Sequence, residues 1–351
     1  MRPILFAMTI AMLLQSISAS HSQTVTPSYE VATWPQFRKA AVSYTFDDNC
    51  PNQLALAVPM FSNYGFTLTL FTVTNWSLNW TGLQTAAAKG HEIANHTASH
   101  PNLGTLTVDQ QMAEISNASD AINSHITGQR CITLAYPYCG EGSDTLCERY
   151  FVAARGCQGF TEQRTPGNFM NVSSVICGSL GPVKTAQDFK TRADGAASSH
   201  GWLVYLIHGI DNDGGYSPLS SDTLRASLEY LNANRETFWV ATFGGVARYI
   251  KERNCVSVHE VSNQDSTIKV QVTDTLDNRI YDIPLTIRRP LPQKWSSGTV
   301  SQNGLPIRSS IVEVDSIEYI MFEVVPDGGE IELKRSAITG MNSLGEDKKK
   351  Q

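Results

Sequence analysis

The chain has 351 residues, of which 41% are hydrophobic and 17% are charged, a composition typical of packed globular proteins and not of long disordered chains. Its 27 basic residues against 33 acidic ones give a net charge of −6, so the excess of positive charge that nucleic acid or an anionic membrane surface attracts is missing. The length exceeds that of one ordinary core, and we therefore expect two domains.

The first 22 residues are typical of a secretory signal peptide. Arg2 precedes an almost unbroken apolar stretch over residues 4–14, and small residues follow it. Such a stretch is too short to span a bilayer, which takes about 20 residues. We predict cleavage before Gln23, export to the periplasm, the cell surface or the extracellular space, and a lead-in segment over residues 23–39.

Export would place the seven cysteines in an oxidising compartment, where disulfides form. The nearest pairs along the chain are Cys139 with Cys147 and Cys157 with Cys177, although spacing alone does not determine the connectivity. An odd number leaves at least one thiol unpaired. No Cys-x-x-Cys motif is present, which argues against a cysteine zinc site, and we expect the cysteines to be structural.

Residues 40–253 alternate short apolar runs with longer amphipathic stretches. Segments 108–126 and 221–234 have the helical spacing of apolar residues. Strands that alternate with helices predict parallel strands in a layered or barrel-shaped α/β domain of about seven units. The runs with the length of buried strands are 41–46, 67–73, 92–95, 132–135, 151–154, 202–207 and 238–242.

The pattern changes near residue 254. Short strand-like segments follow without a helical stretch, and turn signals such as Asn303-Gly304 and Asp327-Gly328-Gly329 separate them. We predict a small antiparallel β-sandwich over residues 254–336 and a polar tail over residues 337–351.

Polar groups follow directly after five of the predicted barrel strands. The carboxyl ends of parallel strands gather at one edge of a sheet or barrel, and we therefore expect these side chains to meet. The groups are Asp47-Asp48, His96 to His100, Tyr136-Pro137-Tyr138, Arg155 and His208.

Two of these segments contain the ligand types of a metal site. His96 and His100 are four residues apart, a spacing that places both imidazoles on one face of a helix. Asp48 would complete a set of two histidines and one aspartate, with open positions for water and substrate. Asp47 would then be free to act as a base. Each motif alone is more often a surface feature, a core feature or a solvated turn, but their joint placement at strand ends favours a site.

These motifs resemble those of the polysaccharide deacetylase family, also called the NodB-homology domain. The resemblance covers roughly residues 40–250 and leaves the C-terminal region unexplained. The segments that follow the order and spacing of the family are Thr45-Phe46-Asp47-Asp48, His96-Thr97-Ala98-Ser99-His100-Pro101, Tyr136-Pro137-Tyr138 and Leu206-Ile207-His208.

The resemblance implies a distorted (β/α) barrel that removes acetyl groups from N- or O-acetylated sugars. It also implies a divalent metal ion, most commonly Zn²⁺, with Co²⁺, Ni²⁺, Mn²⁺ or Fe²⁺ as alternatives. By position it assigns Asp48, His96 and His100 to the metal, Asp47 to the general base, His208 to the general acid and the backbone N–H of Tyr138 to the oxyanion.

Two features depart from the pattern of the family. Many members carry an arginine three residues before the tyrosine of the third motif, where it orients the base, whereas this chain has Ala135. The aspartate–tryptophan motif that usually partners the catalytic histidine is not visible either. We hypothesise that Arg155, at the end of the next strand, supplies the missing positive charge beside Asp47. The alternative is a structural arginine.

An acetylated carbohydrate is therefore the predicted partner, and Trp76 and Trp80 would either stack on sugar rings or belong to the core. The alternative function is a non-catalytic carbohydrate-binding protein on a deacetylase scaffold. The two departures fit that alternative, whereas the retained Asp47 and His208 argue against it. The glycan, the choice between amide and ester bonds, and the oligomeric state are left open.

Overall fold

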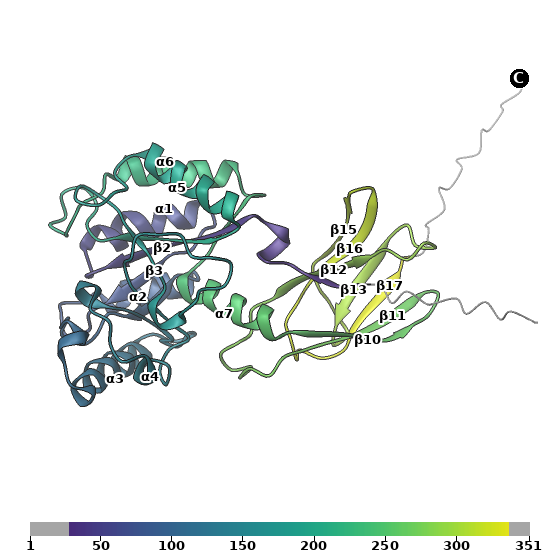
Figure 1. Cartoon of the computed structure of the whole chain (residues 1–351), viewed down its shortest axis with the longest axis horizontal. Coiled ribbons are helices and arrows are strands. Elements are labelled where there is room, and N and C mark those ends of the chain that lie inside the picture. The colour runs from purple at the N-terminus through teal and green to yellow at the C-terminus, as the bar shows by residue number, and fades with distance from the viewer. Residues whose placement is uncertain (1–27, 337–351) are drawn as a thin grey trace, which may run out of the picture.

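A computed structural model describes residues 28–336, which form two domains arranged along the longest axis of the molecule (Figure 1). The predicted signal peptide, residues 1–22, and the predicted polar tail, residues 337–351, lie outside the described residues. Within residues 28–336, no helix has the length and apolar character needed to cross a membrane.

The first domain is built on a parallel sheet. A bridge between Arg155 and Val172, just before the last strand of the sheet, brings its two edges together, and the predicted distorted (β/α) barrel is thereby confirmed. In spatial order the strands are β6 (Ala153–Arg155), β5 (Thr133–Ala135), β4 (Glu92–Asn95), β3 (Thr69–Thr72), β2 (Ala40–Asp47), β8 (Trp202–Ile207) and β7 (Val175–Ile176), with β9 (Phe238–Val240) also paired to β2.

Helices cover this sheet (Figure 1). Two of them begin at capping boxes, in which Thr107 and Thr185 exchange hydrogen bonds with the residue three positions later and so satisfy free backbone N–H groups. The helices are α1 (Val58–Asn63), α2 (Trp80–Ala88), α3 (Val108–His125), α4 (Asp144–Cys147), α5 (Ala186–Ser199), α6 (Ser221–Ala233) and α7 (Phe243–Cys255), with short turns η1 (Pro35–Phe37), η2 (Gln53–Ala57), η3 (Leu103–Thr105), η4 (Pro137–Cys139) and η5 (Phe169–Asn171).

Strand β2 is buried over all eight of its residues because both faces of the sheet are covered. Val42, Tyr44 and Phe46 pack in the cluster beneath the outer helices, whereas Ala41 packs in the second cluster, inside the barrel. Side chains alternate between the two faces of a strand. Asp47 therefore points into the barrel at the carboxyl end of β2.

The second domain is a sandwich of two antiparallel sheets, which confirms the predicted β domain. Alternate residues such as Val270, Ile287, Phe322 and Leu333 form its core. One sheet has the order β1 (Glu30–Val31), β12 (Leu285–Pro290), β16 (Ile317–Val324) and β15 (Ser309–Val314), and the other has the order β10 (Ser257–Asn263), β11 (Thr267–Thr273), β17 (Ile331–Arg335), β13 (Gly298–Gln302) and β14 (Leu305–Pro306).

The N-terminal lead-in contributes a strand to this sandwich. Glu30 and Val31 pair antiparallel with Arg288 and Ile287 of β12, and Arg288 also forms an ion pair with Glu30 at 2.6 Å. A strand of two residues has no detectable alternation of apolar and polar side chains, so this pairing could not be predicted from the sequence.

One disulfide joins Cys139 to Cys157, with their Cα atoms 5.8 Å apart. The sequence neighbours Cys147 and Cys177 are free and buried, so neither of the two pairs that are nearest along the chain forms. The physical reason is strand adjacency. β5 and β6 are neighbours in the sheet, and the segments that leave their carboxyl ends lie side by side.

Candidate active site and metal centre

The side chains predicted at the strand ends meet in one cavity of about 520 Å³. Each apolar run leads to the same edge of the barrel, as expected for parallel strands. The structure thus brings together every residue proposed for the site, and it adds aromatic residues from neighbouring loops. The lining includes Asp47, Asp48, Trp76, His96, His100, Tyr138, Arg155, His208 and Tyr216.

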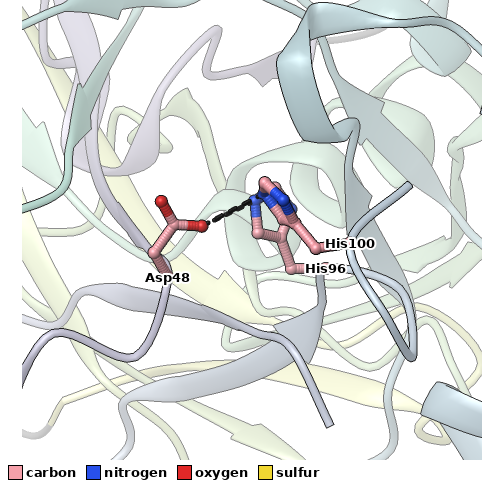
Figure 2. A group of neighbouring side chains, drawn as sticks. All are labelled: Asp48, His96 and His100. Carbon is pink, nitrogen blue, oxygen red and sulfur yellow. Dashed lines mark ion pairs between the residues drawn. The ribbon is translucent and has the colours of Figure 1, made fainter. Parts of the chain in front are cut away.

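Asp48, His96 and His100 offer three ligand atoms that all lie within 4.8 Å of one another (Figure 2). Asp48 Oδ1 is 3.5 Å from His96 Nε2 and 3.2 Å from His100 Nε2. Donors bound to Zn²⁺ at about 2.0–2.1 Å in a tetrahedron are roughly 3.3 Å apart. The spacing and the nitrogen and oxygen donors fit a divalent cation. Asp48 Oδ1 is also buried without a hydrogen-bond partner among the described residues.

The two histidines are not on a helix, and that expectation is wrong. Residues 96–100 form a loop after β4, in which Thr97 and His100 have φ of 66° and 64°. The loop satisfies its own backbone groups, because Asn95 Oδ1 accepts a hydrogen bond from Thr97 N at 2.7 Å and Thr97 Oγ1 accepts one from His100 N at 2.9 Å. Local side-chain bonds of this kind compete with helix formation.

A hydrogen bond orients the ring of His96. Its Nδ1 lies 2.8 Å from the carbonyl oxygen of Ala135, and because a carbonyl can only accept, Nδ1 carries the proton. The lone pair of Nε2 is then directed toward Asp48 and the cavity. Hydrogen bonds to the other ring nitrogen are the usual means by which proteins orient histidine ligands.

Asp48 is turned into the cavity by a left-handed turn, with φ of 69° at Asp48 and 53° at Asn49. Asp and Asn adopt this conformation more readily than other residues. Asn49 also bonds to both backbone groups of Val73, at 3.2 and 3.0 Å. Burial would raise the pKa of Asp48, but its contacts with His100 and His96 outweigh burial and hold that pKa well below its usual value. The carboxylate is therefore ionised at neutral pH.

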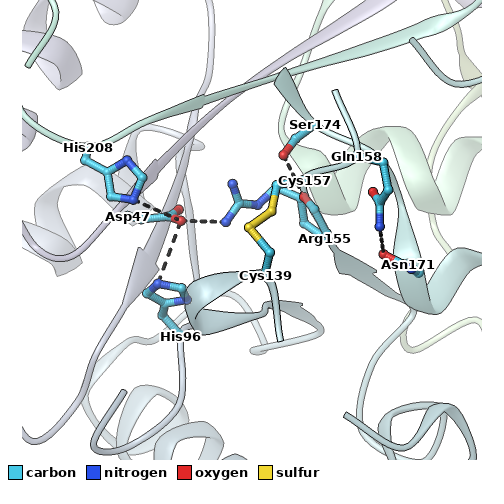
Figure 3. The surroundings of a disulfide bond; sticks show 10 residues. Asp47, His96, Cys139, Arg155, Cys157, Gln158, Asn171, Ser174 and His208 are labelled. Carbon is cyan, nitrogen blue, oxygen red and sulfur yellow. Dashed lines mark hydrogen bonds and ion pairs between the residues drawn. A yellow bond between two sulfur atoms is a disulfide. The ribbon is translucent and has the colours of Figure 1, made fainter. Parts of the chain in front are cut away.

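Asp47 is buried beside Arg155, whose Nη2 lies 2.5 Å from Asp47 Oδ2 (Figure 3). Asp47 Oδ2 is also 3.7 Å from His96 Nε2 and 4.0 Å from His208 Nε2. The other oxygen, Oδ1, is buried and has no hydrogen-bond partner among the described residues. A buried carboxylate that is paired on one oxygen and free on the other is suited to receive a proton.

Arg155 occupies the register position of the arginine that the family pattern leads one to expect. Ala135 at the end of β5 pairs directly with Arg155 at the end of β6, and directly paired residues project from the same face of a sheet. A long side chain from β6 thus reaches Asp47 from the strand beside Ala135. The guanidinium also lies over the ring of Phe71, 5.2 Å from its centroid.

His208 follows β8 and completes the acid–base cluster. Its Nε2 is 3.8 Å from Asp48 Oδ2, and its Nδ1 is buried without a partner in the described structure. Burial lowers the pKa of His208, with Asp47 and Asp48 acting in the opposite direction. Asp213 does not orient it, because the carboxylate of Asp213 accepts hydrogen bonds from the amides of Ile210 and Gly215.

Three exposed aromatic rings surround the histidines. The rings of Trp76 and Tyr138 lie 5.1 and 4.7 Å from the ring of His100, and Tyr216 lies 5.0 Å from His208. Sequence reasoning missed Tyr216, which has no signal besides its place soon after a strand-end histidine. Trp80 is not in the cavity, since it stacks on His125 at 4.1 Å and packs against the core.

The amide of Tyr138 faces no acceptor. Tyr138 has φ of 55°, and its backbone N–H donates no hydrogen bond within residues 28–336. Its neighbours Cys139 and Gly140 are bonded back into the turn instead, to the carbonyl oxygens of Tyr136 and Pro137. A free N–H at the rim of a cavity is a group that can bind a developing oxyanion.

Residues 35–150 match the family model described as polysaccharide deacetylase. That match contains the aspartate pair, both histidines and Tyr138. This part of the chain is thus similar to the polysaccharide deacetylase family, in agreement with the resemblance of its motifs. Arg155 and His208 of the same barrel lie beyond the matched segment.

The barrel and the sandwich together resemble part of a much longer protein. A gellan lyase from Bacillus sp is 29% identical over 333 residues, which cover 89% of this chain but only 13% of that relative. Solved structures similar to the barrel include a family 4 acetyl xylan esterase from Clostridium thermocellum with a cobalt ion, at 19% identity and a TM-score of 0.43, covering 59% of this chain and 89% of that one. A peptidoglycan deacetylase from Bacillus subtilis has 19% identity and a TM-score of 0.40, covering 61% and 92%.

Proposed function

We propose that the barrel domain is a metal-dependent hydrolase that removes acetyl groups from N- or O-acetylated polysaccharides or oligosaccharides. The observation that carries this proposal is the joint geometry of Asp47 and the Asp48–His96–His100 cluster. A candidate base, free on one oxygen, lies 3.7 Å from a candidate metal ligand. The match of residues 35–150 to the polysaccharide deacetylase model supports the same reaction.

Asp48, His96 and His100 would hold the divalent cation, with Zn²⁺ as the first choice for two imidazoles and a carboxylate. A cation held there supplies Lewis acidity, which polarises the acetyl carbonyl and makes water easier to deprotonate. His96 and His100 project from one loop, and Asp48 projects from another, so the cluster also joins the ends of β2 and β4.

Asp47 accepts the proton of the attacking water in this mechanism. Its Oδ1 has no hydrogen-bond partner among the described residues, while the bond from Arg155 to Oδ2 restrains the rotation of the carboxylate. Arg155 also supplies a positive charge that compensates a buried carboxylate. The pair therefore combines a reactive oxygen with a restrained orientation.

Tyr138 and His208 act on the two other atoms that change charge in the reaction. These are the carbonyl oxygen and the nitrogen or oxygen atom of the leaving group. The Tyr138 N–H donates to the carbonyl oxygen as that oxygen becomes negative. His208 Nε2 donates a proton to the departing amine or alkoxide. His208 Nε2 lies 3.8 and 4.0 Å from the carboxylates of Asp48 and Asp47, which partly offset the lowering of its pKa by burial.

A polymeric carbohydrate is the substrate class that the rim supports. Trp76, Tyr138 and Tyr216 are 42%, 70% and 51% exposed, and exposed rings beside a polar site suit the apolar faces of sugars. The printed name of the gellan lyase relative also refers to a polysaccharide. We further propose that the protein is exported to an oxidising compartment, in which the Cys139–Cys157 disulfide would persist.

A non-catalytic carbohydrate-binding role is the second candidate. The observation that favours it is the buried Nδ1 of His208, which lacks the carboxylate partner of the family pattern. An unsupported histidine is held less firmly for proton transfer. The same aromatic rim would then bind sugar without chemistry.

The two candidates are separated by measuring acetate release together with bound metal. Protein loaded with Zn²⁺, Co²⁺, Ni²⁺ or Mn²⁺ is incubated with acetylated chito-oligosaccharides, peptidoglycan, acetylated xylan and acetylated gellan. We expect acetate release from at least one substrate. Asp47→Asn should lower the rate by about 10²–10⁴-fold with bound metal retained, since it removes only the base.

Asp48→Asn should instead lose the metal, and Asp265→Asn, which changes an exposed carboxylate in the second domain, should change neither property. Metal-loaded protein that releases no acetate from any substrate, and whose sugar affinity is the same in Asp47→Asn, would contradict the hydrolase and support the binding protein.

A further inference from the structure

The Cys139–Cys157 disulfide lines the same cavity as the candidate catalytic groups. It connects η4, which follows β5, to the segment that follows β6 (Figure 3). Cys139 is the residue after Tyr138, and Cys157 is two residues after Arg155. A single covalent bond thus lies beside both the proposed oxyanion donor and the arginine that restrains the proposed base.

The η4 turn has a backbone that needs support. Tyr138 and Cys139 have φ of 55° and 58°, and the left-handed region is unfavourable for a non-glycine residue. Two hydrogen bonds hold the turn, from Cys139 N to Tyr136 O at 3.2 Å and from Gly140 N to Pro137 O at 3.0 Å. Such conformations persist where the surroundings over-determine them, and here the disulfide is the further restraint.

The anchor at the other end of the disulfide is firmly held. Gly156 N donates to Val172 O at 2.9 Å, and Ser174 Oγ donates to Gly156 O at 2.6 Å. The Arg155 side chain is buried against Asp47. The disulfide therefore ties a strained, exposed turn to a rigid strand end.

The bond is also accessible. Cys139 is exposed and Cys157 is half-buried, whereas Cys50, Cys131, Cys147 and Cys177, the other cysteines of the barrel strands and loops, are buried. A dithiol reductant reaches this bond from the substrate side. Two electrons and two protons from the dithiol convert the cystine to two thiols, and the dithiol closes to its own cyclic disulfide.

We propose that Cys139–Cys157 is a positioning cross-link that keeps the Tyr138 N–H directed into the cavity, and that its reduction lowers turnover while the metal stays bound. This inference rests on the proposed hydrolase function. The metal ligands lie in the loops after β2 and β4, and no bond of the cystine reaches them. A loss of the cross-link should therefore separate the turnover number from metal affinity.

The test compares the oxidised protein, the dithiothreitol-treated protein and Cys139→Ser/Cys157→Ser, with Cys255→Ser as the control for an exposed cysteine outside the cavity. The turnover number should fall about tenfold or more on reduction, because misalignment of one oxyanion donor has effects of this order. KM and Zn²⁺ affinity should change little. Reoxidation should restore the rate, and the double variant should not respond to dithiothreitol.

Amide hydrogen exchange provides a readout that does not depend on activity. Reduction should accelerate exchange in residues 138–140 and leave β5, β6 and the melting temperature of the barrel nearly unchanged. Unchanged exchange in the turn, or an unchanged turnover number in the reduced protein, would overturn the cross-link proposal. Loss of metal or global unfolding in parallel with activity would assign the disulfide a general structural role instead. If no variant releases acetate, the exchange result still tests whether the disulfide holds the turn at residues 138–140.

Discussion

At the scale of single residues, the distance between Arg155 and Asp47 matters more than the position of the arginine in the sequence. Arg155 lies on the strand beside Ala135, directly opposite it in register, and its Nη2 still reaches Asp47 Oδ2. A side chain as long as arginine spans the separation of neighbouring strands, about 4.8 Å. We therefore propose that Arg155 supplies the charge beside Asp47 that the family pattern leads one to expect from position 135.

Moving the arginine back tests this equivalence. Arg155→Ala should lower acetate release by about 10–100-fold, the usual cost of removing a group that orients a reactive one. Ala135→Arg combined with Arg155→Ala should restore most of the lost rate, because the new side chain starts opposite the vacated space. The rates are measured at equal metal occupancy.

Arg225→Ala, on the exposed face of α6, is the matched control and should behave like the unmodified protein. A full rate in Arg155→Ala would show that Arg155 is structural. A double variant that folds and binds metal but stays as slow as Arg155→Ala would contradict the equivalence of the two positions.

At the scale of secondary structure elements, Glu92 joins four elements at the end of the barrel opposite to the cavity. Its carboxylate accepts hydrogen bonds from Thr69 of β3 at 2.9 Å, Thr133 of β5 at 2.6 Å and the Gly244 amide in the first turn of α7 at 2.9 Å. A negative charge is favourable near a helix N-terminus. Three strands and a helix thus share one buried acceptor.

Glu92→Ala should destabilise the protein by about 2–4 kcal/mol, because it leaves three buried donors without a partner. Urea unfolding measures this change. The turnover number of the folded variant should be nearly unchanged, since the residue lies three positions before Asn95 at the far end of β4. Glu92→Gln, which keeps one acceptor, should have a stability between those of the parent and Glu92→Ala. A Glu92→Ala protein as stable as the parent would contradict the proposal that Glu92 holds the four elements together.

At the scale of the whole molecule, α7 and β1 connect the barrel to the sandwich (Figure 1). Near the C-terminal end of α7, both carboxylate oxygens of Glu252 accept from the amide of Ile283, which precedes β12, at 3.2 Å. Burial raises the pKa of Glu252 to about 8, although the bond from Ile283 acts in the opposite direction. A titratable group therefore lies where the two domains meet.

This shift predicts a pH dependence of stability. Between about pH 5 and pH 8 the folded protein keeps a proton on Glu252 that the unfolded chain releases, so stability falls as the pH rises through this range. Glu252→Gln cannot titrate. The difference between its free energy of unfolding and that of the parent should therefore increase by at least about 1 kcal/mol from pH 5 to pH 8. Urea unfolding at each pH measures this difference.

Asp265→Asn, which changes a carboxylate of the sandwich that is 87% exposed and forms an ion pair with Lys294, is the control and should keep the slope of the parent. Identical slopes for Glu252→Gln and the parent would contradict the assignment.

Local patterns along the chain were enough to predict the class of the fold and the candidate residues of the site. Apolar runs that alternate with helical segments predicted the parallel barrel, and titratable residues directly after those runs predicted a shared edge. This works because strand length, side-chain alternation and the position of a residue at a strand end are local properties. Asp47 points inward like Ala41 because an even number of residues separates their positions in β2.

Which of these groups are neighbours depends on the order and register of the strands. Cys139 pairs with Cys157, and Arg155 pairs with Asp47, because β5 and β6 are adjacent and close on the rest of the sheet. The lead-in joins the sandwich through two residues of β1. Contacts of this kind depend on strand order and register between segments far apart in the chain, and no local pattern of residues encodes them.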